Sequence, residues 1–112
     1  MAFKQERLEK IIVRELSTFL LMEAKDERLK YVTITNCRLT GDLSIATVFY
    51  TVYGTEEQKV STGEVLADAK GMLRSHLGKA LQVKKIPDLK FKYDESMEYG
   101  DKIESILKNL NL

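Results

Sequence analysis

Few side chains in this sequence are of the types that catalyse reactions or bind metals. His76 is the only histidine and Cys37 the only cysteine. A zinc site would need further ligands, because these two residues lie far apart in the sequence on different predicted elements. Ser75 and His76 are neighbours, and adjacent helical side chains do not face each other, so they form a poor nucleophile–base pair. We therefore expect no catalytic residue, no metal site and no cofactor, and we interpret His76 as a surface or partly buried residue.

The acidic residues and the short motifs give no support to an enzyme either. Adjacent acidic pairs fall where turns or helix ends are expected, at Asp26/Glu27, Glu56/Glu57 and Asp94/Glu95, and helix-end electrostatics favours acids there. The sequence lacks G-x-x-x-x-G-K, G-x-G-x-x-G and H-E-x-x-H. It also lacks the G-x-x-G loop with which ordinary KH domains clamp single-stranded RNA. A nuclease stays a weak alternative, since acid–base catalysis needs converging groups.

Positive charge is concentrated between residues 66 and 92. This segment holds seven basic and two acidic residues, a net charge of +5, whereas the rest of the chain holds eleven basic and fifteen acidic residues, a net charge of −4. Such a block indicates one electropositive region, with a merely solvated helix face as the alternative. We predict a surface that binds phosphate backbones more than bases. Its predicted residues are Lys70, Arg74, Lys79, Lys84, Lys85, Lys90 and Lys92.

Hydrophobic periodicity predicts the elements of the first half of the chain. Residues 4–24 have apolar side chains at spacings of three and four, which is typical of a helix. The β-branched segments 31–39 and 43–53 flank the turn residues Thr40-Gly41-Asp42 and predict a hairpin. A change of apolar parity near Asn36 predicts a bulge. The second strand has apolar residues on both faces, which indicates a central position in the sheet.

The second half is predicted to contain two helices, a strand and a last helix. A helical pattern runs from residue 54 to about 83, and Gly71 in its middle weakens a helix by roughly 1 kcal/mol relative to alanine. We therefore predict two helices that meet at an angle, with Gly78 on the second one allowing a phosphate to approach. Residues 89–94 alternate as a third strand, and 103–110 form an apolar helical stripe.

The predicted order α-β-β-α-α-β-α is that of an α+β fold, with helices packed on one face of a three-stranded sheet. The 112 residues fit a single domain spanning 1–112. A lone cysteine gives no internal disulfide, and the sequence shows no signal peptide and no membrane span. We expect a cytoplasmic monomer with no membrane partner.

Several motifs, in order along residues 4–107, resemble the bacterial ribosome-binding factor A family. The strongest are Ala69-Lys70-Gly71, Leu73-Arg74-Ser75, Leu77-Gly78-Lys79-Ala80 and the run from Ile86 to Ser96. Val32-Thr33-Ile34-Thr35 and the segment from Asp42 to Phe49 are also similar. The resemblance implies a type II KH-like fold in which an Ala-x-Gly kink, here Ala69 and Gly71, replaces the G-x-x-G loop.

The resemblance also implies a function. Members of the family bind free small (30S) ribosomal subunits, contact 16S ribosomal RNA near its 5′-terminal helix, and assist late assembly, rRNA processing and cold adaptation. They bring no cofactor and no small-molecule substrate. Glu27 stands where many relatives have proline, so the connection there is expected to be less rigid, and Lys84 replaces a common arginine. The alternative from another class is a protein–protein interaction module that acts through the last helix, 103–110.

Overall fold

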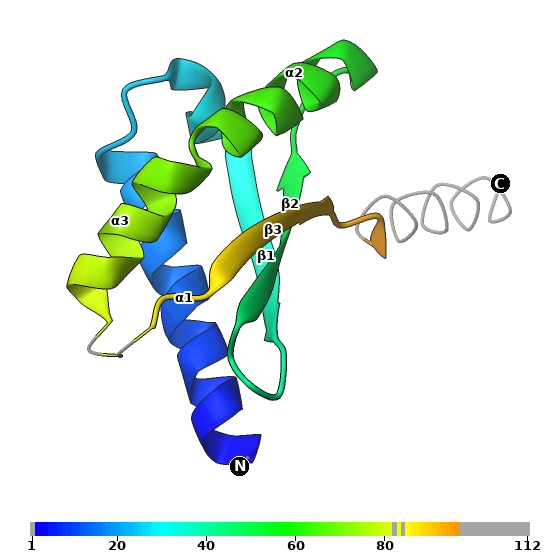
Figure 1. Cartoon of the computed structure of the whole chain (residues 1–112). Coiled ribbons are helices and arrows are strands. Elements are labelled where there is room, and N and C mark those ends of the chain that lie inside the picture. Colours follow the sequence, from blue (N-terminus) through cyan, green and yellow to red (C-terminus); the bar gives the residue numbers. More distant parts are fainter. Residues whose placement is uncertain (1, 82, 84, 97–112) are drawn as a thin grey trace, which may run out of the picture.

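The computed structural model contains the predicted elements in the predicted order, as far as the third strand (Figure 1). It describes residues 2–81, 83 and 85–96, except for the side chains of residues 2 and 3. The predicted helix over 103–110, and the protein-binding role that depends on it, lie outside the described residues. The elements are α1 (Ala2–Met22), the 3-10 helix η1 (Glu27–Tyr31), β1 (Val32–Leu39), β2 (Ile45–Val52), α2 (Glu56–Asp68), α3 (Lys70–Ala80) and β3 (Asp88–Tyr93).

The three strands form one mixed sheet in the order β1-β2-β3. Strand β2 pairs antiparallel with β1 and parallel with β3. The prediction that the second strand is central is therefore confirmed. Its buried positions alternate strictly, at Ala46, Val48, Tyr50 and Val52.

The predicted bulge in β1 is also present. The register passes from Ile34 opposite Tyr50 to Asn36 opposite Phe49, which leaves Thr35 without a partner residue on β2. The Thr35 hydroxyl donates a hydrogen bond to Asp94 Oδ2 over 2.6 Å, at the end of β3. The extra residue of the bulge thus ties the first strand of the sheet to the end of the third.

The helices pack on one face of the sheet. Helix α1 lies against β1, and α3 lies beside α1, with Leu16, Leu73 and Leu77 fully buried between these layers. Helix α2 reaches the same face, since Lys59 lies over the Tyr93 ring at 5.2 Å. The opposite face carries the alternate side chains of the strands and is covered by none of the described helices. Nor is any described helix long and apolar enough to cross a membrane.

The break between α2 and α3 falls at Ala69, as the Ala-x-Gly motif predicts. Ala69 ends one helix and begins the next, with φ −82° and ψ −3°, and its side chain is buried. Leu66 before the break and Leu73 after it are both fully buried. A change of axis at this point lets both helices turn their apolar side chains toward one core, and Figure 1 shows the two axes at an angle.

Candidate nucleic-acid interface

Cys37, the one thiol of the chain, is unsuited to chemistry in the folded state. It is 1% exposed on the helix-covered face of β1. Burial, with a smaller effect from the Glu9 carboxylate, raises the pKa of the thiol to about 12. Because the thiolate is the nucleophile, this cysteine stays protonated and unreactive near neutral pH.

We expect the folded protein at pH 8 to resist iodoacetamide over the time in which the urea-unfolded protein is fully alkylated. Unfolding removes the burial that keeps the Cys37 thiol protonated. Mass spectrometry of the intact chain at successive times measures the reaction. Equal alkylation rates for the folded and unfolded chain would contradict the assignment.

His76 lies partly buried between α3 and α1, which agrees with the predicted surface or partly buried position. Its Nε2 lies 3.2 Å from Glu15 Oε2 on α1, and its ring lies 4.7 Å from that of Phe19. These contacts join α3 to α1 and leave the imidazole half-buried. Within the described ranges, no three His, Cys, Asp or Glu side chains are placed to hold a metal ion.

One group of the predicted cations lies on α3 and just after it. Lys70 is half-buried in the first turn of the helix, and Lys79 is exposed in its last turn. Lys85 is exposed in the connection to β3, whereas Lys84 lies outside the described residues. We call Lys70, Lys79 and Lys85 the helix cations. They present positive charge on the helix layer of the molecule.

Arg74, one of the predicted RNA-binding residues, makes its hydrogen bonds within the fold. Its Nη2 donates to the Ile86 carbonyl over 2.9 Å and its Nε to the Pro87 carbonyl over 3.2 Å. The guanidinium also lies 3.6 Å from Asp88 Oδ1. Gly78 likewise faces this connection, because a Cβ there would lie 3.6 Å from Ile86. Arg74 therefore fastens α3 to the start of β3.

Replacing Arg74 with lysine is expected to lower the free energy of unfolding by about 1–2 kcal/mol. Lysine keeps the charge but cannot reproduce the two hydrogen bonds of the planar guanidinium. Hydrogen bonds from a charged donor to backbone carbonyls stabilise a partly exposed site by about 1–2 kcal/mol. Urea unfolding measures the change, with Lys79→Arg as a control on the same helix. An unchanged midpoint for Arg74→Lys would show that these bonds stabilise nothing.

The other group of cations lies on the opposite side of the sheet. Lys90 and Lys92 are exposed on β3, and they alternate with the buried Leu89. In the register of the sheet, Thr47 stands between Arg38 and Lys90, and Phe49 stands between Asn36 and Lys92. We call Arg38, Lys90 and Lys92 the sheet cations. Arg38 was missed in the sequence because it lies outside the 66–92 block, and only strand pairing places it near the two lysines.

The expectation that all these cations converge on one side is therefore wrong. A strand sends successive side chains to opposite faces. Since Leu89 points to the core beneath the helices, Lys90 and Lys92 must point to the uncovered face. None of the helix cations or sheet cations makes an ion pair within the part of the chain that the structure describes. The molecule thus carries positive charges that make no ion pair on both its helix side and its uncovered sheet face, and these charges are available to a partner.

Gly71 beside the break is exposed, and a Cβ there would have no atom within 4 Å. We expect Gly71→Ala to raise the free energy of unfolding by about 0.5–1 kcal/mol, because alanine restricts the unfolded chain and favours the helix. Thermal unfolding measures this. A loss of stability would mean that the break needs glycine itself, contrary to the free space seen here.

Comparisons with known proteins agree with the resemblance in sequence. Residues 4–107 match the family model described as ribosome-binding factor A. A ribosome-binding factor A of Staphylococcus saprophyticus is 42% identical over 111 residues, which cover 99% of this chain and 97% of the relative.

Solved structures share the fold. A Thermotoga maritima protein described as a candidate ribosome binding factor A superposes with a TM-score of 0.73 at 32% identity, covering 86% of this chain and 92% of the other. A homology model of Thermus thermophilus RbfA, fitted into a cryo-EM map of a 30S–RbfA complex, superposes with a TM-score of 0.67 at 24% identity, covering 81% of this chain and 96% of the other.

Proposed function

The chain belongs to the ribosome-binding factor A family, and from this premise we propose that it binds free small ribosomal subunits as a late maturation factor. Its relatives carry ribosome binding in their name, and the Thermus protein of the same fold has been placed in a complex with the 30S subunit. The proposed contact region on 16S rRNA is near the 5′-terminal helix. The site of action is the cytoplasm.

The observation that supports this proposal is the set of exposed or half-buried cations that make no ion pair among the described residues. Positive side chains that make no internal ion pair can neutralise phosphates and release their counterions, which supplies most of the sequence-independent affinity for nucleic acid. We propose that Lys70, Lys79, Lys84 and Lys85 contact RNA from the helix side, and Lys90 and Lys92 from the sheet side. Arg74 contributes by holding α3 and the connection in place.

Two positive surfaces on opposite sides suit a protein that sits between RNA segments. Each surface can bind the phosphates of a different helix, so the 1–112 domain holds them in one arrangement. A binding protein changes the RNA only if it has unequal affinity for two arrangements. In this proposal the chain acts as a monomer, without catalysis, cofactor or small-molecule substrate.

Co-sedimentation tests the proposed function. Purified protein is mixed with separated small subunits, large subunits or joined ribosomes, and each mixture is centrifuged through a sucrose gradient. We expect the protein to migrate with free small subunits and not with large subunits. Migration with neither, or equally with both, would refute the proposal. Specific cleavage of precursor rRNA by the purified protein would refute the non-catalytic part.

A further inference from the structure

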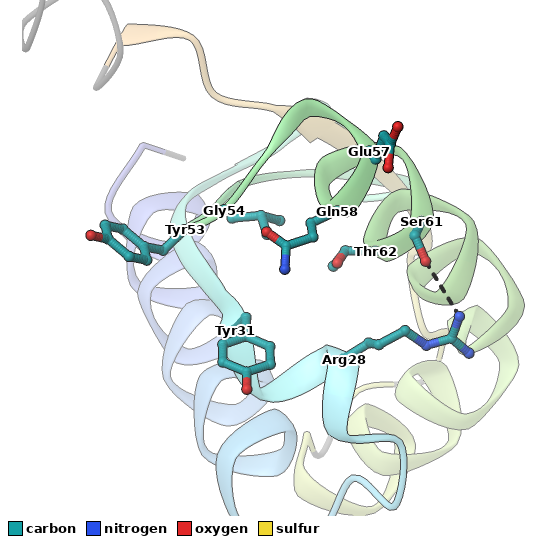
Figure 2. A pocket seen from close by; sticks show the side chains of 9 residues that line it. Arg28, Tyr31, Tyr53, Gly54, Glu57, Gln58, Ser61 and Thr62 are labelled. Atoms are coloured by element: carbon teal, nitrogen blue, oxygen red, sulfur yellow. Dashed lines mark hydrogen bonds between the residues drawn. The ribbon is translucent and has the colours of Figure 1, made fainter.

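A groove of about 550 Å³ lies between η1, the end of β2 and the first turns of α2 (Figure 2). This volume falls within the range of small-ligand sites. None of the helix cations or sheet cations lines it. Arg28 and Tyr31 stand on one side, Gln58 and Ser61 on the other, and Tyr53 at one end, with its ring turned away from the groove.

Two tyrosines at this groove are far more exposed than folding requires. Tyr53 is 95% exposed and Tyr31 63% exposed, whereas Tyr50 on β2 is buried. A tyrosine in water forgoes the stabilisation that its ring would gain by burial. Exposed aromatic rings beside a groove form the kind of platform on which RNA-binding proteins stack unpaired bases.

Gln58 supplies a hydrogen-bond donor with a fixed direction. Its Oε1 accepts the Thr55 backbone N–H over 2.7 Å, while the Thr55 hydroxyl accepts the Gln58 N–H over 3.2 Å, so the two residues form a capping box. A Cβ at Gly54 would collide with this amide oxygen. The cap thus fixes which end of the amide is oxygen, and Figure 2 shows its nitrogen turned toward the groove.

Thr62 adds a hydroxyl to the lining. Its side chain is only 3% exposed, and it has no hydrogen-bond partner within the described part of the chain. Every fully enclosed side-chain oxygen or nitrogen among the described residues has a hydrogen-bond partner. Because the Thr62 hydroxyl has none, solvent must reach it. Thr62 is one of the residues that line the groove. A hydroxyl in this position can donate to or accept from a ligand.

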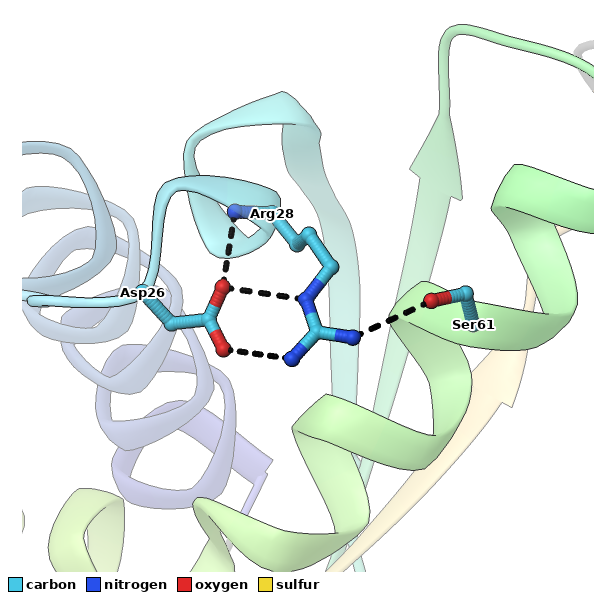
Figure 3. A network of polar contacts seen from close by, with 3 residues as sticks. All are labelled: Asp26, Arg28 and Ser61. Carbon is cyan, nitrogen blue, oxygen red and sulfur yellow. Dashed lines mark hydrogen bonds and ion pairs between the residues drawn. The ribbon is translucent and has the colours of Figure 1, made fainter.

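The charge around the groove disfavours a phosphate inside it. Figure 3 shows the Arg28 guanidinium held by Asp26, with Nε–Oδ1 at 3.1 Å and Nη2–Oδ2 at 2.9 Å, and by Ser61 Oγ at 3.3 Å. The Asp26 carboxylate therefore offsets its charge. The exposed Glu57 on the rim adds a negative charge. Neutral polar groups and rings remain, and these suit a base.

Resting on the proposed function, we propose that this groove binds one unstacked base of small-subunit RNA. The base receives a hydrogen bond from Gln58 in the groove, and the exposed ring of Tyr53 or Tyr31 turns over the base and stacks on it. Phe49 lies beside Lys92 in the sheet. Tyr53 comes four residues after Phe49, which is roughly 13 Å along an extended chain. An RNA strand whose phosphates contact Lys92 can therefore reach the groove within a few nucleotides.

The test measures the affinity of purified small subunits for groove variants. Tyr53→Ala is expected to weaken binding by roughly 5- to 150-fold, the usual effect of losing one stacked base. Tyr53→Phe keeps the ring and is expected to bind within about twofold of the unmodified protein. Gln58→Glu keeps the capping box but replaces the amide donor, and is expected to weaken binding by at least about fivefold. Val60→Glu adds one negative charge, as Gln58→Glu does, at an exposed position outside the groove. It therefore shows the effect of the added charge alone.

Cross-linking identifies the occupant. The complex with small subunits is irradiated with ultraviolet light, digested and examined by mass spectrometry, and a nucleotide attached to Tyr53 or Tyr31 is the expected product. Normal affinity of Tyr53→Ala, while the unmodified protein binds subunits, overturns the groove and leaves the proposed function intact. A cross-link to a ribosomal protein instead of RNA overturns the base assignment. No binding by the unmodified protein overturns both.

Discussion

Replacing Leu73 with alanine is expected to lower the free energy of unfolding by about 2–5 kcal/mol. Leu73 is fully buried one turn after the break between α2 and α3, within the core that α1 and the sheet share. Removing its methyl groups loses their transfer free energy and leaves a cavity, and leucine-to-alanine changes in such sites fall in this range. Since small domains have only about 5–15 kcal/mol of stability, much of the fold's margin would be lost.

Urea unfolding followed by circular dichroism measures this effect. Met72→Ala, on the exposed side of the same helical turn, is the matched control and is expected to change the free energy by less than about 1 kcal/mol. If Leu73→Ala were as mild as Met72→Ala, α3 would not be packed on the core as described.

Reversing the charge of two sheet cations, with Lys90→Glu and Lys92→Glu together, is expected to weaken binding to small subunits by roughly 30-fold or more at physiological salt. Each phosphate contact contributes about fivefold under these conditions, from the counterions that it releases, and glutamate adds repulsion. Both side chains are exposed, and neither makes a hydrogen bond or ion pair with another described residue. The free energy of unfolding should therefore change little.

A second double variant, Lys70→Glu with Lys79→Glu on α3, is measured in the same assay. The control is Lys4→Glu with Lys10→Glu on α1, which changes the net charge by the same amount. Binding assays with separated small subunits give the affinities. Loss of affinity in both test pairs supports two RNA-facing surfaces. Loss in only one reduces the interface to that surface, and equal loss in the α1 control would show that total charge alone matters.

Local patterns in the sequence predicted much of this fold because they report local physics. The apolar parity change near Asn36 gave the bulge, the two-faced pattern of residues 43–53 gave the central strand, and Ala69-Lys70-Gly71 gave the break between helices. Each of these depends on side chains within a few residues of one another.

The arrangement of the candidate site depends on long-range pairing, which periodicity does not contain. Proximity in sequence suggested that Arg74 and Lys90 share a surface, but β3 alternates and Arg74 turns to the carbonyls of Ile86 and Pro87. Arg38 joins Lys90 only through the register across β2. The groove of Figure 2 is likewise made by segments brought together from η1, β2 and α2.

The connection after α1 shows the same limit. The resemblance implied a less rigid connection at Glu27, and the structure adds that Asp26 accepts the Arg28 backbone N–H over 3.0 Å and caps η1. The hydrogen bond from the Arg28 side chain, with that backbone bond, also lowers the pKa of Asp26. The turn after α1 thus contains an ion pair and a helix cap, which the sequence pattern did not predict.

The salt dependence of binding tests the electrostatic account most directly. The dissociation constant of the complex with small subunits is measured between 50 and 200 mM salt for the unmodified protein and for the Lys90→Glu/Lys92→Glu variant. With roughly five phosphates contacted, affinity should fall roughly 10²–10³-fold over this range, and the variant should lose about two units of logarithmic slope. Affinity that does not change with salt, or identical slopes for the two proteins, would contradict binding through these cations.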